Sequence, residues 1–365
     1  MRVSLLAEQL LQEVPGGIGT YVRALIRYLP SWGIEVEPVV AWHGQNEMFE
    51  AGLSQARRLR LPRAAAYKRW TSGRGPQIRG GGELVHAPSL AIPRKDSRPL
   101  VVTVHDVLFL DFPDAYPASG VSFHTAMLRR LQDADAVIVP SEATAVRVRE
   151  KTKAQPVVVP MGTEFAAPDP GDVDRVLDRL EVRRPYVLWC GTVEPRKNPE
   201  GVIHGFVSSV ESGVPASDEL ALYLVGPPGW WSGDVGEFLE EHGMTDRVRR
   251  LGAQPPAVRA ALYAGAEAFL FPSLAEGFGL PVVEAMACGA PVVTSDRSSL
   301  PEVAGDAAVL CDPDDEDSIG RALSKILRDP ALAADLRARG FARASQFTWD
   351  RTARETAAVY RGLLG

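Results

Sequence analysis

The chain has 365 residues, of which 45% are hydrophobic, and is therefore long enough to form two domains with cores of their own. Its formal net charge of −6 argues against a nucleic-acid-binding protein. No apolar run approaches the ~18 residues of a membrane span, and the three cysteines lack the spacing of a metal or disulfide site. The start, MRVSLLAEQLL, does not resemble a secretion signal, so a cytoplasmic protein is expected.

The first half of the chain alternates short apolar strands with helices. A strand at 2–7 leads into the glycine-rich block PGGIG and an amphipathic helix from about Ile18. Further strands are predicted at 36–42, 84–89, 99–106, 135–141 and 157–162. Strands that alternate with helices in this way predict a parallel sheet covered by helices on both faces.

Residues 57–79 interrupt this alternation with a basic segment. The sequence RRLRLPRAAAYKRWTSGRGPQIR contains eight Arg and Lys residues and no acid, with Tyr67 and Trp70 among them. One interpretation is a flexible loop that grips an acidic acceptor or an anionic membrane surface, which would hold the protein peripherally at the inner face of the membrane. The other interpretation is a solvated basic loop without a partner.

The second half repeats the alternation after a predicted connector, PDPGDVDRVLDRL. Strands are predicted at 184–192, 220–228, 248–253, 268–273, 290–296 and 307–313. The repeated pattern predicts two doubly wound domains, each with a ligand crevice outside the carboxyl ends of its strands. The last stretch carries Trp349, Ala353, Thr356, Tyr360 and Leu363 at helical spacing, and this helix could pack on either domain.

The most specific chemical signal is the block EGFGLPVVE, which begins at Glu276 and ends at Glu284. Gly277 and Gly279 favour a loop, and Pro281 suits a first helical position, which would put Glu284 in the first turn of the helix. Such a loop offers backbone N–H groups and the positive end of a helix dipole to an anion. The carboxylates of Glu276 and Glu284 are better suited to accepting hydrogen bonds from hydroxyl groups than to binding an anion. We therefore expect a ligand that has both phosphates and hydroxyls.

The block EPRKN follows the first strand of the second unit directly and places Arg196 and Lys197 at its carboxyl end. The guanidinium of Arg196 is a forked hydrogen-bond donor and the ammonium of Lys197 is a point charge, so the pair suits a diphosphate. An exposed basic turn would show the same sequence pattern. His105 ends the strand at 99–106 and could move a proton, bind a sugar or be structural. The PGGIG block could approach a phosphate or simply form a tight turn.

Three acidic pairs of the form DxD occur, and such pairs can hold Mg²⁺ or Mn²⁺ together with a nucleotide. They are found at Asp133/Asp135, Asp172/Asp174 and Asp315/Asp317. None of these pairs adjoins the glycine loop at 276–280, so no metal site is predicted from them.

Several blocks of the sequence resemble those of retaining glycosyltransferases of family 4, which have the GT-B fold. The blocks also occur along the chain in the order found in that family. The resemblance rests on FPSLAEGFGLPVVEAMACGAPVVTSDRSSLPEVAGDAAVLCDP, GTVEPRKN, PGGIGTYV, TVHDV, ADAVIVPSEAT and VVPMG, and it spans nearly the whole chain. It implies two Rossmann-like α/β domains facing a central cleft. Residues 1–170 would bind the acceptor and residues 171–345 the nucleotide-sugar donor, and the helix at 346–365 would cross back to pack on the N-terminal domain.

The resemblance also implies which residues act. The implied donor-binding residues are Gly17, Arg196, Lys197, Glu276, Gly277, Phe278, Gly279, Leu280 and Glu284. The implied catalytic residues are His105, Arg196, Lys197 and Glu276.

Within this set, Glu276 would bind hydroxyls of the donor sugar and Glu284 those of the ribose. Arg196 and Lys197 would neutralise the diphosphate leaving group, and His105 would contact the sugar near the reacting carbon. The backbone N–H groups of residues 278–280 would face the sugar and the diphosphate, and Gly17 would approach the diphosphate from the other domain. Thr192 stands where some relatives carry a further Arg.

The implied reaction is transfer of a hexose, with retained configuration, from a nucleotide-diphosphate sugar such as GDP-mannose to a glycan, lipid-linked or small-molecule acceptor. Cations and N–H dipoles aimed at the developing charge can supply the acceleration, so neither a metal nor another cofactor is expected. Two alternatives stay open: a nucleotide-sugar epimerase or hydrolase on the same fold, and a non-catalytic partner in a glycan-assembly complex. The intact EGFGLPVVE block and the Arg-Lys pair argue against the non-catalytic partner.

Overall fold

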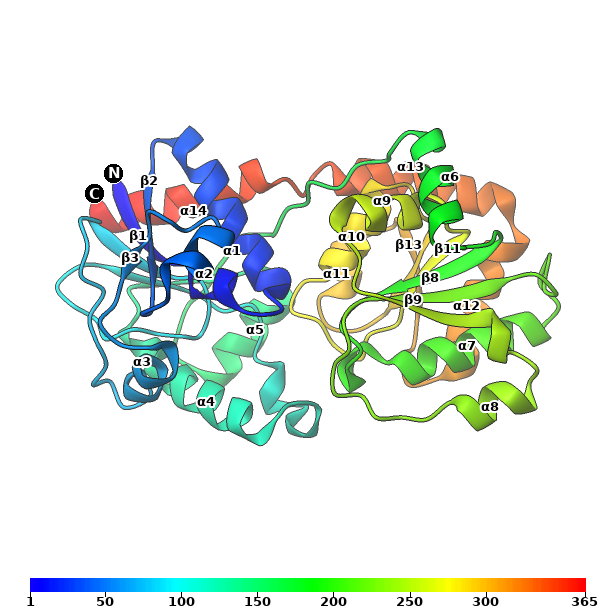
Figure 1. Ribbon diagram of the computed structural model, residues 1–365, viewed down its shortest axis with the longest axis horizontal. Coiled ribbons are helices and arrows are strands. Elements are labelled where there is room, and N and C mark those ends of the chain that lie inside the picture. Colours follow the sequence, from blue (N-terminus) through cyan, green and yellow to red (C-terminus); the bar gives the residue numbers. More distant parts are fainter. The chain divides into compact units, whose positions relative to one another are not determined.

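The computed structural model describes residues 1–365 apart from the side chain of Ala115, and the chain divides into two compact units (Figure 1). The first unit comprises Met1–Gly162 and Trp349–Gly365, and the second comprises Thr163–Thr348. Each unit is a parallel sheet with helices on both faces, which confirms the predicted doubly wound architecture.

The first unit contains a seven-stranded sheet in the order β3-β2-β1-β4-β5-β6-β7. Its strands are β1 Arg2–Leu6, β2 Glu35–Val40, β3 Arg57–Arg58, β4 Leu84–Ala87, β5 Leu100–Thr103, β6 Ala136–Val139 and β7 Val157–Val158. Its helices are α1 Gly16–Tyr28, α2 Gln45–Glu50, α3 Arg63–Trp70, α4 Ala118–Arg129, α5 Glu142–Lys151 and α14 Trp349–Leu364. Its short 3-10 turns are η1 Glu8–Leu11, η2 Leu29–Trp32, η3 Leu108–Leu110, η4 Pro113–Ala115 and η5 Arg130–Asp133.

Successive side chains along each strand point to opposite faces of this sheet. On one face, Val102 and its neighbours form an apolar core with α3, α4 and α5. On the other face, His86 Nδ1 lies 2.6 Å from the hydroxyl of Tyr360 on α14, and His86 Nε2 lies 2.8 Å from Thr103 Oγ1. Thr103 in turn bonds the hydroxyl of Tyr21 on α1 at 3.1 Å. This buried polar chain fixes α14 to the first unit.

The basic segment at 57–79 is not the flexible loop that its composition suggested, because it contains β3 and α3. Trp70 is 1% exposed, and its indole N–H donates to Pro76 O at 2.9 Å. The ring of Tyr67 stacks between Trp70, at 5.4 Å, and Phe123 of α4, at 5.6 Å. Burial of these aromatic rings holds α3 on the unit and leaves the basic side chains on its surface.

The second unit contains a six-stranded sheet in the order β10-β9-β8-β11-β12-β13. Its strands are β8 Tyr186–Cys190, β9 Ala221–Val225, β10 Val248–Gly252, β11 Ala268–Phe271, β12 Val292–Ser295 and β13 Ala308–Cys311. Its helices are α6 Pro170–Arg179, α7 Pro199–Glu211, α8 Gly236–Glu241, α9 Pro256–Ala264, α10 Leu280–Ala287, α11 Leu300–Ala304, α12 Glu316–Arg328 and α13 Pro330–Ala344. Its 3-10 turns are η6 Pro195–Lys197 and η7 Thr245–Arg247.

The predicted connector at 168–180 is mostly the helix α6, which belongs to the second unit. Val173 and Leu177 lie four positions apart and are both buried on one face of this helix. This spacing is typical of a helix and is the signal in the sequence that could have indicated α6.

Both sheets reverse their strand order at one place, between β1 and β4 in the first unit and between β8 and β11 in the second. Connections that leave the two central strands at such a point run to opposite faces, and a crevice opens at the carboxyl ends of the strands. In the second unit, the segments that leave β8 and β11 are residues 191–198 and 272–279. The strand order therefore brings the EPRKN and EGFGL blocks to the same edge of the same sheet.

Candidate functional site

Asn198 joins the two segments at this edge of the second sheet. It has a left-handed backbone with φ of +55° and caps α7 by accepting the Gly201 N–H at 3.2 Å. Its side-chain amide donates to Pro272 O, just after β11, at 3.1 Å. In addition, the N–H of Leu274 donates to Arg196 O at 2.9 Å. The basic turn and the segment that leads into the glycine loop are thus joined by one side-chain and one main-chain hydrogen bond.

Gly279 shapes the glycine loop directly before α10. Its φ is +109°, a left-handed conformation that favours glycine, and a Cβ added there would lie 2.7 Å from Leu300 Cδ2, so the Leu300 side chain would have to shift. The helix begins at Leu280, which makes Pro281 the second helical residue rather than the first. Glu284 consequently lies in the second turn of α10 and not, as predicted, in the first.

Two serines form hydrogen bonds with the main chain of the glycine loop. Ser299 Oγ lies 2.9 Å from Glu276 O and 2.8 Å from Phe278 O, and Ser298 Oγ accepts the N–H of Glu276 at 2.9 Å. The ring of Phe278 packs edge-on against Phe347 with centroids 5.6 Å apart. These contacts fix the loop before any ligand binds.

Within the part of the chain that the structure describes, the N–H groups of Phe278, Gly279 and Leu280 have no protein acceptor. Gly277 lies buried in the same loop. Unpaired N–H groups at the start of a helix, together with the helix dipole, favour an anion. The loop can therefore offer main-chain donors to a phosphate or an oxyanion.

Arg196, Lys197 and Glu276 form a buried ion-pair cluster. Glu276 Oε1 lies 2.5 Å from Lys197 Nζ, and Glu276 Oε2 lies 3.0 Å from Arg196 Nη1. The other terminal nitrogen of Arg196 lies 2.5 Å from Glu194 Oε1. The side chain of Glu276 is only 8% exposed, and those of Arg196 and Lys197 are 12% exposed. Two cations therefore converge beside the glycine loop and are held there by carboxylates.

The cluster sets the charge of its carboxyl groups. Burial by itself would raise the pKa of Glu276, but attraction to Arg196 and Lys197 outweighs burial and lowers that pKa to about 2. At Glu194 burial dominates, and the pKa is raised despite the attraction of Arg196. Glu276 is accordingly a carboxylate at neutral pH, able to accept hydrogen bonds from hydroxyl groups but not to donate them.

Glu284 lies in a second polar cluster that sequence reasoning missed. Its Oε2 accepts hydrogen bonds from Arg259 Nη1 at 2.8 Å and from the hydroxyl of Tyr263 at 3.2 Å. Burial raises the pKa of Glu284, and Arg259 opposes this effect. Arg259 and Tyr263 lie four positions apart on one face of α9, and this spacing is the signal that could have found them.

The two remaining predicted residues belong to the first unit. Gly17 is exposed in the first turn of α1, which begins at Gly16, two residues earlier than the predicted start at Ile18. His105 follows β5, and its Nε2 donates to Pro88 O at 2.9 Å. Burial lowers the pKa of His105, so the ring is neutral at pH 7 and Nδ1 is left as an acceptor. The roles of both residues in a reaction stay predictions.

The acidic pairs have structural partners. Asp135 bonds Lys95 Nζ at 2.6 Å, Asp133 pairs with Arg130 at 2.7 Å, and Asp315 caps α12. Among the residues that the structure describes, no three His, Cys, Asp or Glu side chains are grouped so as to hold a metal ion. Of the helices described, none has both the length and the apolar character needed to cross a bilayer.

Solved structures similar to this chain share its architecture. Sucrose-phosphate synthase from Thermosynechococcus elongatus matches with a TM-score of 0.74 and 22% identity, covering 100% of this chain and 99% of that one. Anabaena HepE in complex with UDP and glucose matches with a TM-score of 0.75 and 18% identity, covering 100% of both chains. The fold of the present chain is GT-B, as predicted.

Sequence relatives and family models agree with this fold. O-antigen chain mannosyltransferase B from Escherichia coli is 31% identical over 286 residues, covering 76% of this chain and 74% of its own length. The MMP alpha-(1->4)-mannosyltransferase of Mycolicibacterium hassiacum is 29% identical, covering 99% and 98%. The model for glycosyl transferases group 1 matches residues 176–343, which include both polar clusters, and the model for glycosyltransferase family 4 matches residues 15–166. The chain is therefore a glycosyltransferase that belongs to family 4.

Proposed function

We propose that this glycosyltransferase transfers a hexose, with retention of configuration, from a nucleotide-diphosphate sugar such as GDP-mannose to a glycan, lipid-linked or small-molecule acceptor. The observation that carries the proposal is the cluster of Arg196 and Lys197 on Glu276, beside the unpaired N–H groups of Phe278, Gly279 and Leu280. A diphosphate needs clustered cations and N–H donors, and a sugar needs carboxylates that accept from its hydroxyls. The mannosyltransferase names of the two relatives favour mannose.

When the donor binds, Arg196 and Lys197 exchange their ion-pair partner Glu276 for the diphosphate. In the free protein, Glu276 neutralises Arg196 and Lys197, which lie too deep to be left unpaired. The diphosphate brings new negative charge to both cations, and the oxygens of Glu276 then become available to the hydroxyls of the sugar. Glu284, held by Arg259 and Tyr263, accepts from the ribose in the same way.

In the reaction, the bond between C1 and the diphosphate oxygen breaks, and its electron pair leaves with the diphosphate. Arg196, Lys197 and the N–H groups of the glycine loop stabilise this growing charge. The acceptor oxygen forms a bond to C1 from the same face and gives its proton to the departing diphosphate. His105 is neutral, and its Nδ1 accepts a hydrogen bond from the donor sugar. No step calls for a metal ion.

The test is to incubate the protein with GDP-, UDP-, ADP- and TDP-sugars, with and without an acceptor, and to measure released nucleoside diphosphate. Release that depends on the acceptor is expected. Release without an acceptor would instead indicate a hydrolase, interconversion of the donor sugar an epimerase, and no turnover with any donor a non-catalytic partner. NMR of the product should show the anomeric configuration of the donor. Loss of turnover in EDTA, with recovery on adding Mn²⁺, would contradict metal independence.

The donor itself can be found by thermal shift. A ligand that binds only the folded protein raises the melting temperature, and at a concentration of ~100 times its Kd it adds about 2.7 kcal/mol to the free energy of unfolding. We expect GDP-mannose to raise the melting temperature more than the other nucleotide sugars. An equal response to every donor would contradict the assignment of mannose while leaving the diphosphate site intact.

A further inference from the structure

The two carboxyl groups of the ion-pair cluster have different surroundings. Both oxygens of Glu276 contact a cation, Lys197 at 2.5 Å and Arg196 at 3.0 Å. Glu194 contacts Arg196 through its Oε1 at 2.5 Å, and in the described part of the chain its Oε2 accepts no hydrogen bond. Glu194 therefore has an oxygen to which a proton can be added without breaking the contact with Arg196.

The main chain holds Glu194 inside the cluster. Its side chain is only 9% exposed, and its carbonyl accepts the N–H of Lys197 at 3.0 Å. The preceding residue, Val193, donates its N–H to Pro227 O at 3.2 Å and accepts the N–H of Trp231 at 3.2 Å. These bonds join the residue before Glu194 to the segment that follows β9. The carboxyl group is thus fixed in the cluster, where little water can solvate its charge.

Three charged groups face the carboxyl group of Glu194. Two are Arg196 and Lys197, which follow it in the chain, and the third is Glu276 on the glycine loop. The segment at 227–231, which packs against the main chain beside Glu194, carries no charged side chain. Burial has the largest effect and raises the pKa of Glu194, Glu276 raises it further, and the two cations oppose the rise. Any additional negative charge on these cations would favour a proton on Glu194.

A nucleotide-sugar donor would bring such a charge. The cluster contains two cations and two carboxyl groups, and their charges cancel when both carboxyl groups are ionised. The diphosphate adds two negative charges at Arg196 and Lys197, in a buried place where solvent screens them poorly. An excess of buried negative charge is unfavourable, and a proton on one carboxyl group would reduce it.

Of the two carboxyl groups in the cluster, Glu194 is better suited to receive this proton. The pKa of Glu276 is about 2 in the free protein, far below neutral pH. Glu276 is also needed as an ionised acceptor for the hydroxyls of the sugar in the proposed function. Glu194 has a raised pKa and makes its one contact with Arg196, the cation that the diphosphate would approach.

We propose that Glu194 gains a proton when the nucleotide sugar binds and loses it when the nucleotide leaves, so that the charge of the cluster follows that of its ligand. The inference rests on the proposed function, because it requires a diphosphate on Arg196 and Lys197. The proton comes from solvent, binds Oε2 and returns to solvent, and no other covalent bond changes. Glu194 is accordingly a positioning residue, which holds Arg196 through Oε1 in both states.

The direction of the pH dependence follows from linkage. A complex that holds Glu194 at a higher pKa than the free protein does takes up a proton at pH values between the two. Donor affinity is then highest below this range and falls by up to about tenfold per pH unit within it. A charge at close range shifts a carboxyl pKa by about 1–3 units, and the diphosphate acts across Arg196, so we expect a total fall of about tenfold.

Titration calorimetry of the full-length protein with GDP-mannose, in the absence of acceptor, tests the proposal. The heat of binding is compared in buffers with different heats of ionisation, because its slope gives the number of protons taken up. We expect proton uptake between about pH 5.5 and about pH 8, and about tenfold weaker binding at the upper end. The diphosphate of a nucleotide sugar is linked at both ends and does not titrate in this range. Binding without proton uptake at any of these pH values would overturn the proposal.

Glu194→Gln separates a change of charge from a purely structural role. Glutamine has the shape of the protonated carboxyl group, and its carbonyl oxygen can still accept from Arg196. The variant should take up no proton, and near pH 8 it should bind GDP-mannose about tenfold more tightly than the wild type. Weaker binding of the variant at every pH would indicate a structural role and overturn the proposal. Proton uptake that persists in the variant would also overturn it, because the proton would then be on Glu276, Glu284 or His105.

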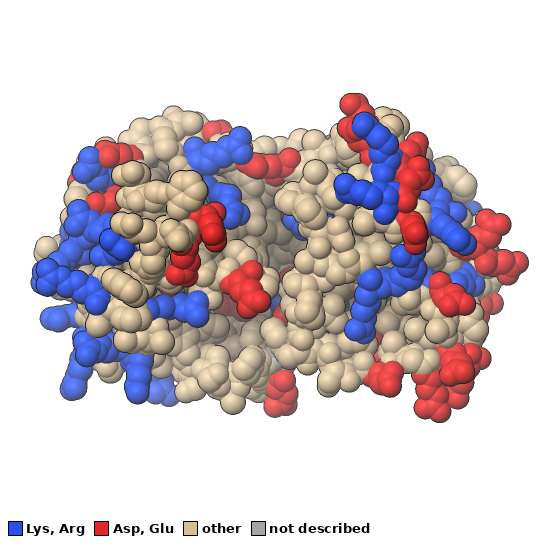
Figure 2. All heavy atoms as spheres, in the orientation of Figure 1, with Lys and Arg blue, Asp and Glu red and all other residues tan. Residues whose placement is uncertain are grey.

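Two single substitutions serve as controls for the carboxyl group. Glu194→Asp keeps an ionisable group at this position and should keep proton uptake. Figure 2 shows exposed Asp and Glu on both units, and Glu219→Gln removes one exposed carboxylate from the second unit. Glu219→Gln should match the wild type in affinity and in proton uptake. Loss of uptake in either control would overturn the assignment to Glu194.

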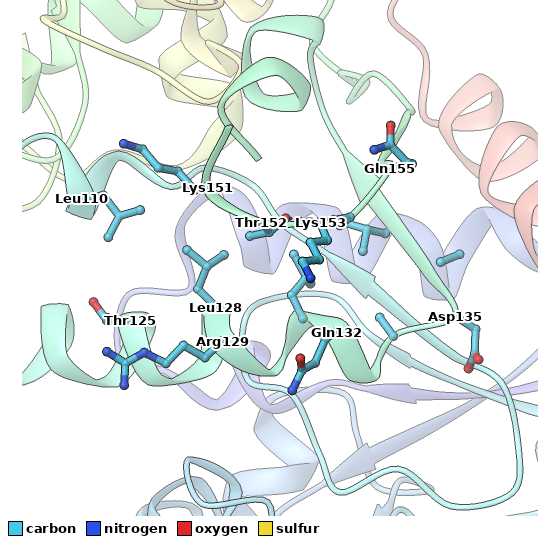
Figure 3. A pocket seen from close by; sticks show the side chains of 15 residues that line it. Leu110, Thr125, Leu128, Arg129, Gln132, Asp135, Lys151, Thr152, Lys153 and Gln155 are labelled. Carbon is cyan, nitrogen blue, oxygen red and sulfur yellow. Dashed lines mark hydrogen bonds between the residues drawn. The ribbon is translucent and has the colours of Figure 1, made fainter. Parts of the chain in front are cut away.

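A third control concerns cations outside the cluster that could attract an anionic nucleotide. Arg129, Lys151 and Lys153 line a hollow of about 880 Å³ in the first unit (Figure 3). The variant R129Q/K151Q/K153Q should keep both the affinity for GDP-mannose and the proton uptake. A loss of either would place the binding outside the cluster and overturn the proposal.

These measurements also distinguish this inference from the proposed function. Turnover that depends on an acceptor, together with donor binding that takes up no proton, would overturn the role of Glu194 and leave the glycosyl transfer intact. If none of the GDP-, UDP-, ADP- and TDP-sugars bound to the protein, both would be overturned together.

Discussion

Replacing Glu276 with Gln tests the energetics of the ion-pair cluster. Arg196 and Lys197 lower the pKa of Glu276 from 4.5 to about 2. A shift of this size corresponds to ~3 kcal/mol of stability at neutral pH. A pKa lowered by folding adds stability that is complete above about pH 4.5 and disappears as the pH falls towards 2. Glu276→Gln should therefore destabilise the second unit by ~3 kcal/mol at pH 7.

The assay is thermal unfolding of wild type and Glu276→Gln at several pH values. For a domain of this size ~3 kcal/mol should lower the melting temperature by about 6–12 °C, and the gap should narrow below about pH 4.5. Glu219→Gln, at an exposed position of the same unit, should have the melting temperature of the wild type at every pH. A Glu276→Gln protein that melts like the wild type at pH 7, or a gap that stays constant down to pH 3, would refute the reasoning.

Three other substitutions probe the proposed donor site. Lys197→Ala should lower turnover ~10²-fold while the protein stays folded, whereas His124→Ala should leave turnover unchanged; steady-state kinetics on both variants decides the point. Tyr263→Phe removes one hydrogen bond to Glu284 and should raise the KM for the donor about fivefold with little change in kcat; an unchanged KM would remove Glu284 from ribose binding. Gly279→Ala should cost ~1–3 kcal/mol in urea unfolding and weaken diphosphate binding, because a φ of +109° is strained for alanine and the added Cβ would displace Leu300; full stability would contradict the loop geometry.

Much of the fold follows from local sequence. Buried parallel strands read as short apolar runs, and AFLF of β11, in which every residue is buried, is such a run. The polar blocks that follow β8 and β11 then fall at one edge of the sheet because the strands are parallel. This is why Arg196, Lys197 and Glu276 could be assigned to one site from the sequence alone.

The sequence could not predict which residues far apart along the chain contact each other. Lys197 and Glu276 are 79 positions apart, and their direct ion pair depends on the strand order β8-β11, which no local pattern specifies. The partners of Glu284 were missed because Arg259 and Tyr263 lie on α9, outside any glycine-rich block. In the basic segment, eight cations hid the apolar face that carries Trp70.

The polar chain His86–Tyr360 has a consequence for biosynthesis. α14 leaves the ribosome only after the whole of the second unit, yet it covers one face of the first sheet. Until it emerges, His86 lacks the Tyr360 hydroxyl, and a buried polar group without a partner destabilises the folded state. The second unit is contiguous in the chain and needs no later segment, so we expect it to complete its folding before the first unit does.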